Sequence, residues 1–250
     1  MADQTVTEST AGRRGPVFED PVLTGSPEVT VLTIEPLDFN VMGNTMLLNF
    51  GGAVTAGRAV VKVDYPASLH PASISRGVES LDRCLRDTAG RILVFAHSQG
   101  AQVASRWLRT HTADPDAPDP ARVSFLLIGN PLRKYGGAGV GQAEVDGTIG
   151  LPTPNDTRYH VTDVKLRYDG WADWPTKPDP IAQANAAQDR FGINGTAAIH
   201  ALGYRTANLF DPDRTTYTEG TTQYVMLPHD PLVALVPNEW IEASYDRPEH

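Results

Sequence analysis

The sequence has little of several features that would indicate other classes of protein. It contains one cysteine, Cys84, so it cannot form an internal disulfide. Its 21 basic and 30 acidic residues give a net charge of −9 without any basic run, which argues against nucleic acid as a partner. No apolar run approaches the roughly 18 residues of a transmembrane segment. Residues 1–16 lack the apolar core of a secretory signal peptide, and the sequence does not determine where the protein resides in or outside the cell.

The histidines also lack a grouping that is typical of a metal centre. No pair is spaced as His-x-x-x-His, and we therefore expect neither a metal nor another cofactor. Apolar residues make up 40% and charged residues 20% of 250 residues, as in an ordinary globular protein. Residues 1–27 are polar and rich in threonine, and predict a flexible tail. Residues 28–250 then predict one domain.

Short apolar runs alternate with helical patterns along this domain. We expect an edge strand at 29–34 and further strands at 45–50, 59–65, 91–95, 123–128, 161–168 and 221–227. Helical spacing of apolar residues predicts helices at 73–87, 102–109 and 180–190. This alternation predicts an α/β fold with three layers around a mainly parallel sheet.

The pentapeptide Ala96-His97-Ser98-Gln99-Gly100 lies between one of these buried strands and a helix. A serine at such a sharp turn is typical of the nucleophile elbow of α/β-hydrolases. Ala96 and Gly100 are small enough to let strand and helix pack closely. The N–H of Gln99 begins the helix and is a natural donor to a developing oxyanion. Ser98 is therefore the predicted nucleophile.

A serine nucleophile needs a base and an acid that orients it, which follow in the order Ser, Asp, His in this fold. Asp169 and Asp173 both follow the strand predicted at 161–168. We favour Asp173, because Trp-Pro after it predicts a rigid turn, and keep Asp169 as the alternative. Among the downstream histidines, spacing alone does not decide between His200 and His229.

The second oxyanion donor usually comes from the loop after an early strand. Gly51-Gly52-Ala53 follows the strand predicted at 45–50, and its glycines would let the backbone approach a substrate. The N–H of Gly52 or Ala53 is the candidate donor, with Ala53 preferred.

Several segments together resemble the serine-hydrolase domain attached to mycobacterial PE and PPE proteins, a cutinase-like branch of the α/β-hydrolases that is related to mycobacteriophage lysin B esterases. They lie within residues 45–236 and include Gly51-Gly52-Ala53, Asp64-Tyr65-Pro66-Ala67-Ser68, Phe95-Ala96-His97-Ser98-Gln99-Gly100-Ala101, Leu127-Ile128-Gly129-Asn130-Pro131 and Tyr168-Asp169-Gly170-Trp171-Ala172-Asp173-Trp174-Pro175. The resemblance implies that Ser98 is the nucleophile. It also favours His200, followed by Tyr204, over His229. Ala96 replaces the first glycine of the family motif, and Ala53 stands where the family often has threonine.

The resemblance implies hydrolysis of carboxylic esters, either acyl esters or cell-wall lipid esters, through Ser98, Asp173 and His200. We expect the acyl pocket near the glycine-rich residues 136–155 and residues 171–204. Two alternatives remain open. The same triad could transfer the acyl group to another acceptor or cleave a thioester, or the fold could serve as a non-catalytic binding or virion module. The sequence does not determine the acyl chain, the head group or the oligomeric state.

Overall fold

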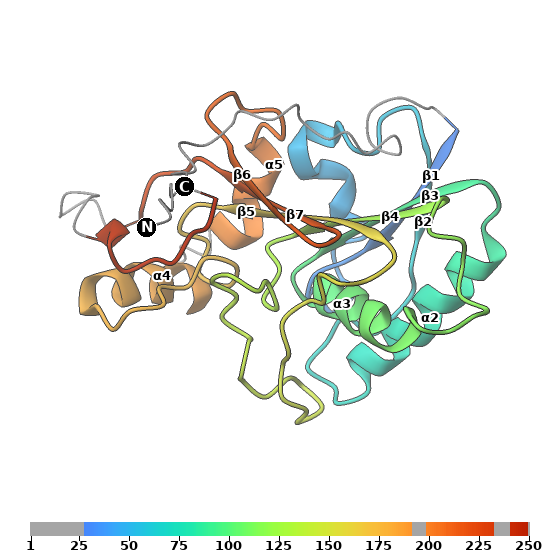
Figure 1. Ribbon diagram of the computed structural model, residues 1–250, viewed down its shortest axis with the longest axis horizontal. Coiled ribbons are helices and arrows are strands. Elements are labelled where there is room, and N and C mark those ends of the chain that lie inside the picture. Colours follow the sequence, from blue (N-terminus) through green and yellow to red (C-terminus); the bar gives the residue numbers. More distant parts are fainter. Residues whose placement is uncertain (1–27, 192–198, 233–240, 250) are drawn as a thin grey trace, which may run out of the picture.

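The computed structural model describes residues 28–191, 199–232 and 241–249, so the tail predicted at 1–27 lies outside the described residues. A seven-stranded sheet with the order β2-β1-β3-β4-β5-β7-β6 forms its centre (Figure 1). The strands are β1 (Val29–Ile34), β2 (Ala59–Lys62), β3 (Arg91–His97), β4 (Val123–Ile128), β5 (His160–Leu166), β6 (Thr215–Glu219) and β7 (Thr222–Leu227). Pairing is parallel except between β6 and β7.

Helical elements cover both faces of this sheet. The helices α2 (Ser73–Asp87) and α3 (Gln99–His111) bury side chains such as Leu81 and Trp107 against one face. On the other face lie a 3-10 segment, η1 (Thr45–Gly52), and the consecutive short elements η3 (Ile199–Gly203) and α5 (Tyr204–Thr206). A further helix, α4 (Pro180–Phe191), follows β5. The predicted three-layer α/β architecture is confirmed.

The strand predicted at 45–50 is wrong, because this segment forms η1. The buried carboxylate of Glu35 accepts hydrogen bonds from the N–H groups of Thr45 (3.0 Å) and Met46 (3.4 Å), which favours a helical turn at this point. Met46 and Phe50 are buried, whereas Leu47 and Leu48 between them are exposed. That spacing suits one face of a helix better than a strand buried on both faces.

The strand order reverses between β1 and β3, because the chain passes from β1 to β2 on one side and returns to β3 on the other. The strand predicted at an edge, β1, consequently lies inside the sheet. Ligands of open parallel sheets bind beyond the carboxyl ends of the strands at such a switch point. Ser98 follows β3 directly and lies at this place. Among the described residues, no helix has the length and apolarity required to cross a membrane.

Candidate active site

Ser98 occupies a strained turn between β3 and α3. Its φ of 55° and ψ of −116° lie outside the regions that non-glycine residues ordinarily adopt. The turn brings the start of α3 against β1: a Cβ atom on Gly100 would lie 2.3 Å from the carbonyl oxygen of Ile34. Glycine at position 100 therefore permits the close packing that holds Ser98 at the tip of the turn.

A chain of hydrogen bonds joins Ser98 to a histidine and a carboxylate. The Ser98 Oγ lies 2.8 Å from His200 Nε2. On the other side of the ring, His200 Nδ1 lies 2.9 and 3.1 Å from the two carboxylate oxygens of Asp169. Asp169 is fully buried and His200 is 8% exposed. The arrangement has the order and geometry of a serine nucleophile, its base and the acid that orients the base.

The surroundings favour an ionised Asp169 and a basic His200. Burial by itself would raise the pKa of the Asp169 carboxyl, but the nearby His200 and the hydrogen bonds that Asp169 accepts lower it. Burial would likewise lower the pKa of the His200 imidazole, but the charge of Asp169 and the hydrogen bond to it raise that pKa above its usual value. The pair is therefore arranged to stabilise the imidazolium that forms when His200 accepts a proton.

Asp173, the acid preferred from the sequence, lies elsewhere, and this preference is corrected in favour of the alternative, Asp169. Its carboxylate pairs with Arg247, at 2.5 Å from Nη2, and with Lys165, at 3.0 Å from Nζ. Burial would raise the pKa of Asp173, but these two cations hold it well below its usual range. Arg247 comes from near the end of the chain and Lys165 from the preceding strand β5, so the local Trp-Pro signal could not reveal this pairing.

The structure also does not bring Ala53 to the elbow. Ala53 is exposed, and its N–H donates to the Phe50 carbonyl at 3.1 Å. The space beside Ser98 is lined by Pro36-Leu37-Asp38, which follows β1, and by Met42, Thr45 and Asn49, but not by Ala53. The expectation failed because it rested on a strand at 45–50 that does not form.

The N–H of Gln99 does begin α3, where a first-turn N–H has no carbonyl partner within the helix. The Gln99 side chain is fixed on both sides: its Oε1 accepts from Ser73 Oγ (3.0 Å) and its Nε2 donates to the Ser68 carbonyl (2.9 Å). This anchoring keeps the beginning of the helix in place beside Ser98.

A cavity of about 430 Å³ opens at the triad. Apolar side chains at its mouth are partly exposed: Leu37 by 39%, Met42 by 62% and Leu202 by 50%. Trp171, Arg190 and Arg205 also line it, which agrees with the expectation of a pocket near 171–204. No lining residue comes from 136–155, so that part of the expectation is wrong.

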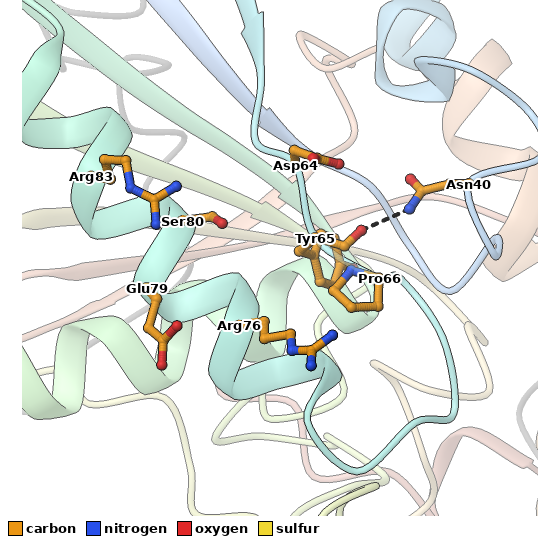
Figure 2. Close-up of a pocket in the computed structure, with 8 residues that line it drawn as sticks. All are labelled: Asn40, Asp64, Tyr65, Pro66, Arg76, Glu79, Ser80 and Arg83. Atoms are coloured by element: carbon orange, nitrogen blue, oxygen red, sulfur yellow. Dashed lines mark hydrogen bonds between the residues drawn. The ribbon is translucent and has the colours of Figure 1, made fainter.

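The other candidates lie apart from this cavity. His229 lines a separate hollow with Leu166 and Gly203, and its Nδ1 lies 2.7 Å from the Asp230 carbonyl. Figure 2 shows another hollow, beside α2, which is lined by Asn40, Asp64, Tyr65, Pro66, Arg76, Glu79, Ser80 and Arg83. Its lining includes Ser80 but no histidine, so it holds no serine–histidine pair.

Tyr204 is a site residue whose role the sequence did not predict. Its hydroxyl donates to Asp169 Oδ2 at 2.7 Å and accepts from the N–H of Leu166 at 3.1 Å. His97 is buried, and its ring lies 5.0 Å from the His200 ring. Burial, followed by the charge of His200, lowers the pKa of His97 to about 3 and keeps this neighbour neutral.

The chain is similar in sequence to several known proteins. Similar curated proteins come from Mycobacterium tuberculosis: SL1278 acyltransferase Chp1 is 30% identical over 67% of this chain and 42% of its own length. Esterase PE16 is 29% identical over 75% of this chain and 37% of its own length. Diacyltrehalose acyltransferase Chp2 is 25% identical over 69% and 51%. The chain thus spans about half or less of the length of these relatives.

Solved structures with some similarity to the chain as a whole include a cutinase-like protein from Cryptococcus sp. It has a TM-score of 0.40 and 18% identity, over 60% of this chain and 80% of that one. Lysin B from mycobacteriophage D29 has a TM-score of 0.39 and 19% identity over 54% and 63%. The sequence profile of the PE-PPE domain matches residues 54–244. The match covers most of the chain, including Ser98, Asp169 and His200, and the chain therefore belongs to the PE-PPE domain family.

Proposed function

We propose that this protein is a serine ester hydrolase that acts through Ser98, His200 and Asp169. The observation that carries the proposal is the hydrogen-bonded chain from the Ser98 hydroxyl through the His200 imidazole to the buried Asp169 carboxylate, with Ser98 held at a positive φ. Relatives named as an esterase and as acyltransferases support acyl chemistry of this kind.

In the proposed reaction, Ser98 Oγ attacks the acyl carbon of an ester while His200 Nε2 accepts its proton. His200 then returns this proton to the oxygen of the leaving alcohol, and the acyl group remains on Ser98. Water attacks the acyl-enzyme with His200 again acting as the base, which releases the acid and restores the serine. Asp169 holds the proton on Nδ1 and stabilises the imidazolium throughout.

The proposed oxyanion hole consists of the N–H groups of Gln99 and Leu37. In the loop after β1, Pro36 has no N–H, and the N–H of Asp38 donates to the Ala67 carbonyl at 3.2 Å. Leu37 is therefore the residue of this loop whose N–H is proposed to reach an oxygen bound at Ser98. The apolar mouth formed by Leu37, Met42 and Leu202 suits an ester with an apolar acyl group.

The test is covalent labelling with a fluorophosphonate probe, followed by mass spectrometry of the modified residue. We expect an adduct on Ser98 that is absent in Ser98→Ala and His200→Ala. His229→Ala is the matched control, because this histidine lines another hollow, and it should label as the wild type does. Hydrolysis of p-nitrophenyl esters should disappear in Ser98→Ala and in His200→Ala. Absence of an adduct on folded wild-type protein would favour a non-catalytic binding module.

Acyl transfer is a second candidate, because two of the relatives are named acyltransferases. The triad would be the same, with an alcohol in place of water at the second step. Product analysis in the presence of a competing alcohol separates the two functions. Free acid alone indicates hydrolysis, whereas a new ester formed in proportion to the alcohol indicates transfer.

A further inference from the structure

A second carboxylate, Asp189, lies behind the triad in the last turn of α4. Its side chain is buried, with 1% of the residue exposed. Asp189 Oδ2 accepts a hydrogen bond from the N–H of Gly170 at 2.8 Å, and Oδ1 accepts from the N–H of Ile199 at 2.9 Å. The N–H of His200 lies 3.2 Å from each of the two oxygens. One carboxylate thus gathers backbone donors from two separate segments.

These two segments carry the acid and the base of the triad. Gly170 is the residue after Asp169, and Ile199 precedes His200. Both segments lie beyond the regular strands, so the hydrogen bonds of the sheet do not fix them to each other. Gly170 allows α4 to approach closely, because a Cβ atom there would lie 2.2 Å from the Ala186 carbonyl oxygen. The Asp189 carboxylate reaches the triad through this close contact.

We propose that Asp189 is a positioning residue that ties the Asp169 segment to the His200 segment and adds a second negative charge behind the imidazole. This inference rests on the proposed function and deepens it. With both segments tied to one carboxylate, His200 can contact Asp169 through Nδ1 and Ser98 through Nε2 at the same time. Well-aligned reacting groups account for a large part of catalysis, and small displacements are correspondingly costly.

The charge environment of His200 makes this role testable by pH. Among the described residues, the titratable or charged groups that face it or share its cavity, apart from Ser98, are Asp169 after β5, Asp189 and Arg190 on α4, His97 on β3, Asp38 after β1, and Tyr204 and Arg205 on α5. Burial alone would lower the pKa of His200, and Asp169 and then Asp189 raise it. Burial, followed by the charge of Asp169, raises the pKa of Asp189 itself, while the Gly170 N–H and His200 counteract this rise. Replacing the Asp189 carboxylate with a neutral amide should therefore lower the pKa of His200.

The experiment compares Asp189→Asn with Asp179→Asn in the full chain. Asp179 is a matched control, because its Oδ1 accepts the N–H groups of Ile181 (2.9 Å) and Ala182 (2.8 Å) at the start of the same helix, away from the triad. The assay is p-nitrophenyl ester hydrolysis across a pH series. For Asp189→Asn we expect kcat to fall by about tenfold or more with KM within about threefold, and the acidic limb of the profile to move to lower pH. Asp179→Asn should keep the wild-type profile.

The outcomes separate this inference from the proposed function. If wild-type protein hydrolyses esters and labels on Ser98, but Asp189→Asn keeps its kcat and its acidic limb, the positioning role is wrong and the triad stands. If the wild type neither labels nor turns over, the proposed function fails first. If Asp189→Asn does not fold, Asp189→Glu decides. It keeps the charge, so we expect a lowered kcat with an acidic limb near that of the wild type, and an unchanged kcat overturns the proposal.

Discussion

Replacing Asp169 with asparagine is the sharpest perturbation of the proposed triad. Four donors surround this carboxylate: His200 Nδ1 at 2.9 Å, the Trp171 N–H at 2.9 Å, the Ala172 N–H at 3.2 Å and the Tyr204 hydroxyl at 2.7 Å. An ionised carboxylate can accept all of them. An amide of the same shape has one NH₂ group that can only donate, and it therefore faces at least one donor wherever it points.

The expected loss follows from the tautomer of His200. In the Asp169→Asn variant, the new NH₂ group donates to Nδ1, the proton moves to Nε2, and the imidazole can no longer accept the proton of Ser98. The corresponding Asp-to-Asn change in a serine protease triad also produces the wrong histidine tautomer, and it lowers kcat by about 10⁴-fold. That loss corresponds to about 5 kcal/mol of transition-state stabilisation. The shape of the side chain is kept, so we expect a smaller effect on folding.

Asp173→Asn should give the opposite pattern. Asp173 is 1% exposed and is the carboxylate shared by Lys165 and Arg247, so its neutralisation leaves Lys165 with Glu249 alone, at 3.5 Å, and Arg247 with Glu242 alone. Breaking a buried pair in this way costs about 3–5 kcal/mol. For a chain of this size, that corresponds to a melting temperature lower by about 6–20 °C. The folded fraction should keep kcat within about tenfold, because the carboxylate does not contact His200.

The two variants are compared by ester hydrolysis below the melting temperature and by calorimetry. The prediction is a crossed result, with activity lost in Asp169→Asn and stability lost in Asp173→Asn. A large loss of kcat in Asp173→Asn, together with near-normal turnover in Asp169→Asn, would refute the assignment of the acid.

Two further predictions concern the base and the elbow. In the wild type, kcat/KM should rise with pH through the pKa of His200, because only the neutral imidazole accepts the proton of Ser98. The midpoint of this rise should lie above the usual value of 6.5. A midpoint below that value in the pH–rate profile would contradict the raised pKa. Gly100→Ala should abolish labelling of Ser98 and lower the melting temperature, because the added Cβ would lie 2.3 Å from the backbone oxygen of Ile34. Wild-type labelling and stability in that variant, measured by mass spectrometry and calorimetry, would contradict the account of the elbow.

Local patterns in the sequence were sufficient to predict the layers of the fold and the place of Ser98 at a tight turn between strand and helix. Buried strands and amphipathic helices have periodicities that do not depend on distant residues, and the helix at Ser73–Asp87 and the strand at Val123–Ile128 have the predicted bounds. The nucleophile elbow is also local, because the strand, the tight turn and the helix are consecutive. The choice of His200 over His229 required the resemblance to a family, because the spacing of the residues did not distinguish the two histidines.

Other features depended on residues that meet only in the folded chain. Asp169 and Asp173 follow the same strand, and their partners distinguish them: His200 contacts the first, and Arg247 from near the end of the chain pairs with the second. Neither partner can be read from the neighbourhood of the acids.

The sequence by itself therefore determined the three-layer architecture and the position of Ser98, because both follow from short-range periodicity and turn chemistry. Only the tertiary structure showed which carboxylate contacts His200, which loop lies beside Ser98, and that Asp189 lies behind them. The loop after β1 reaches Ser98 because β1 and β3 are neighbours in the sheet, and Asp189 reaches Gly170 and His200 because α4 packs against them. These contacts join residues far apart in the chain, and only the packing of the sheet and helices brings them within hydrogen-bond distance.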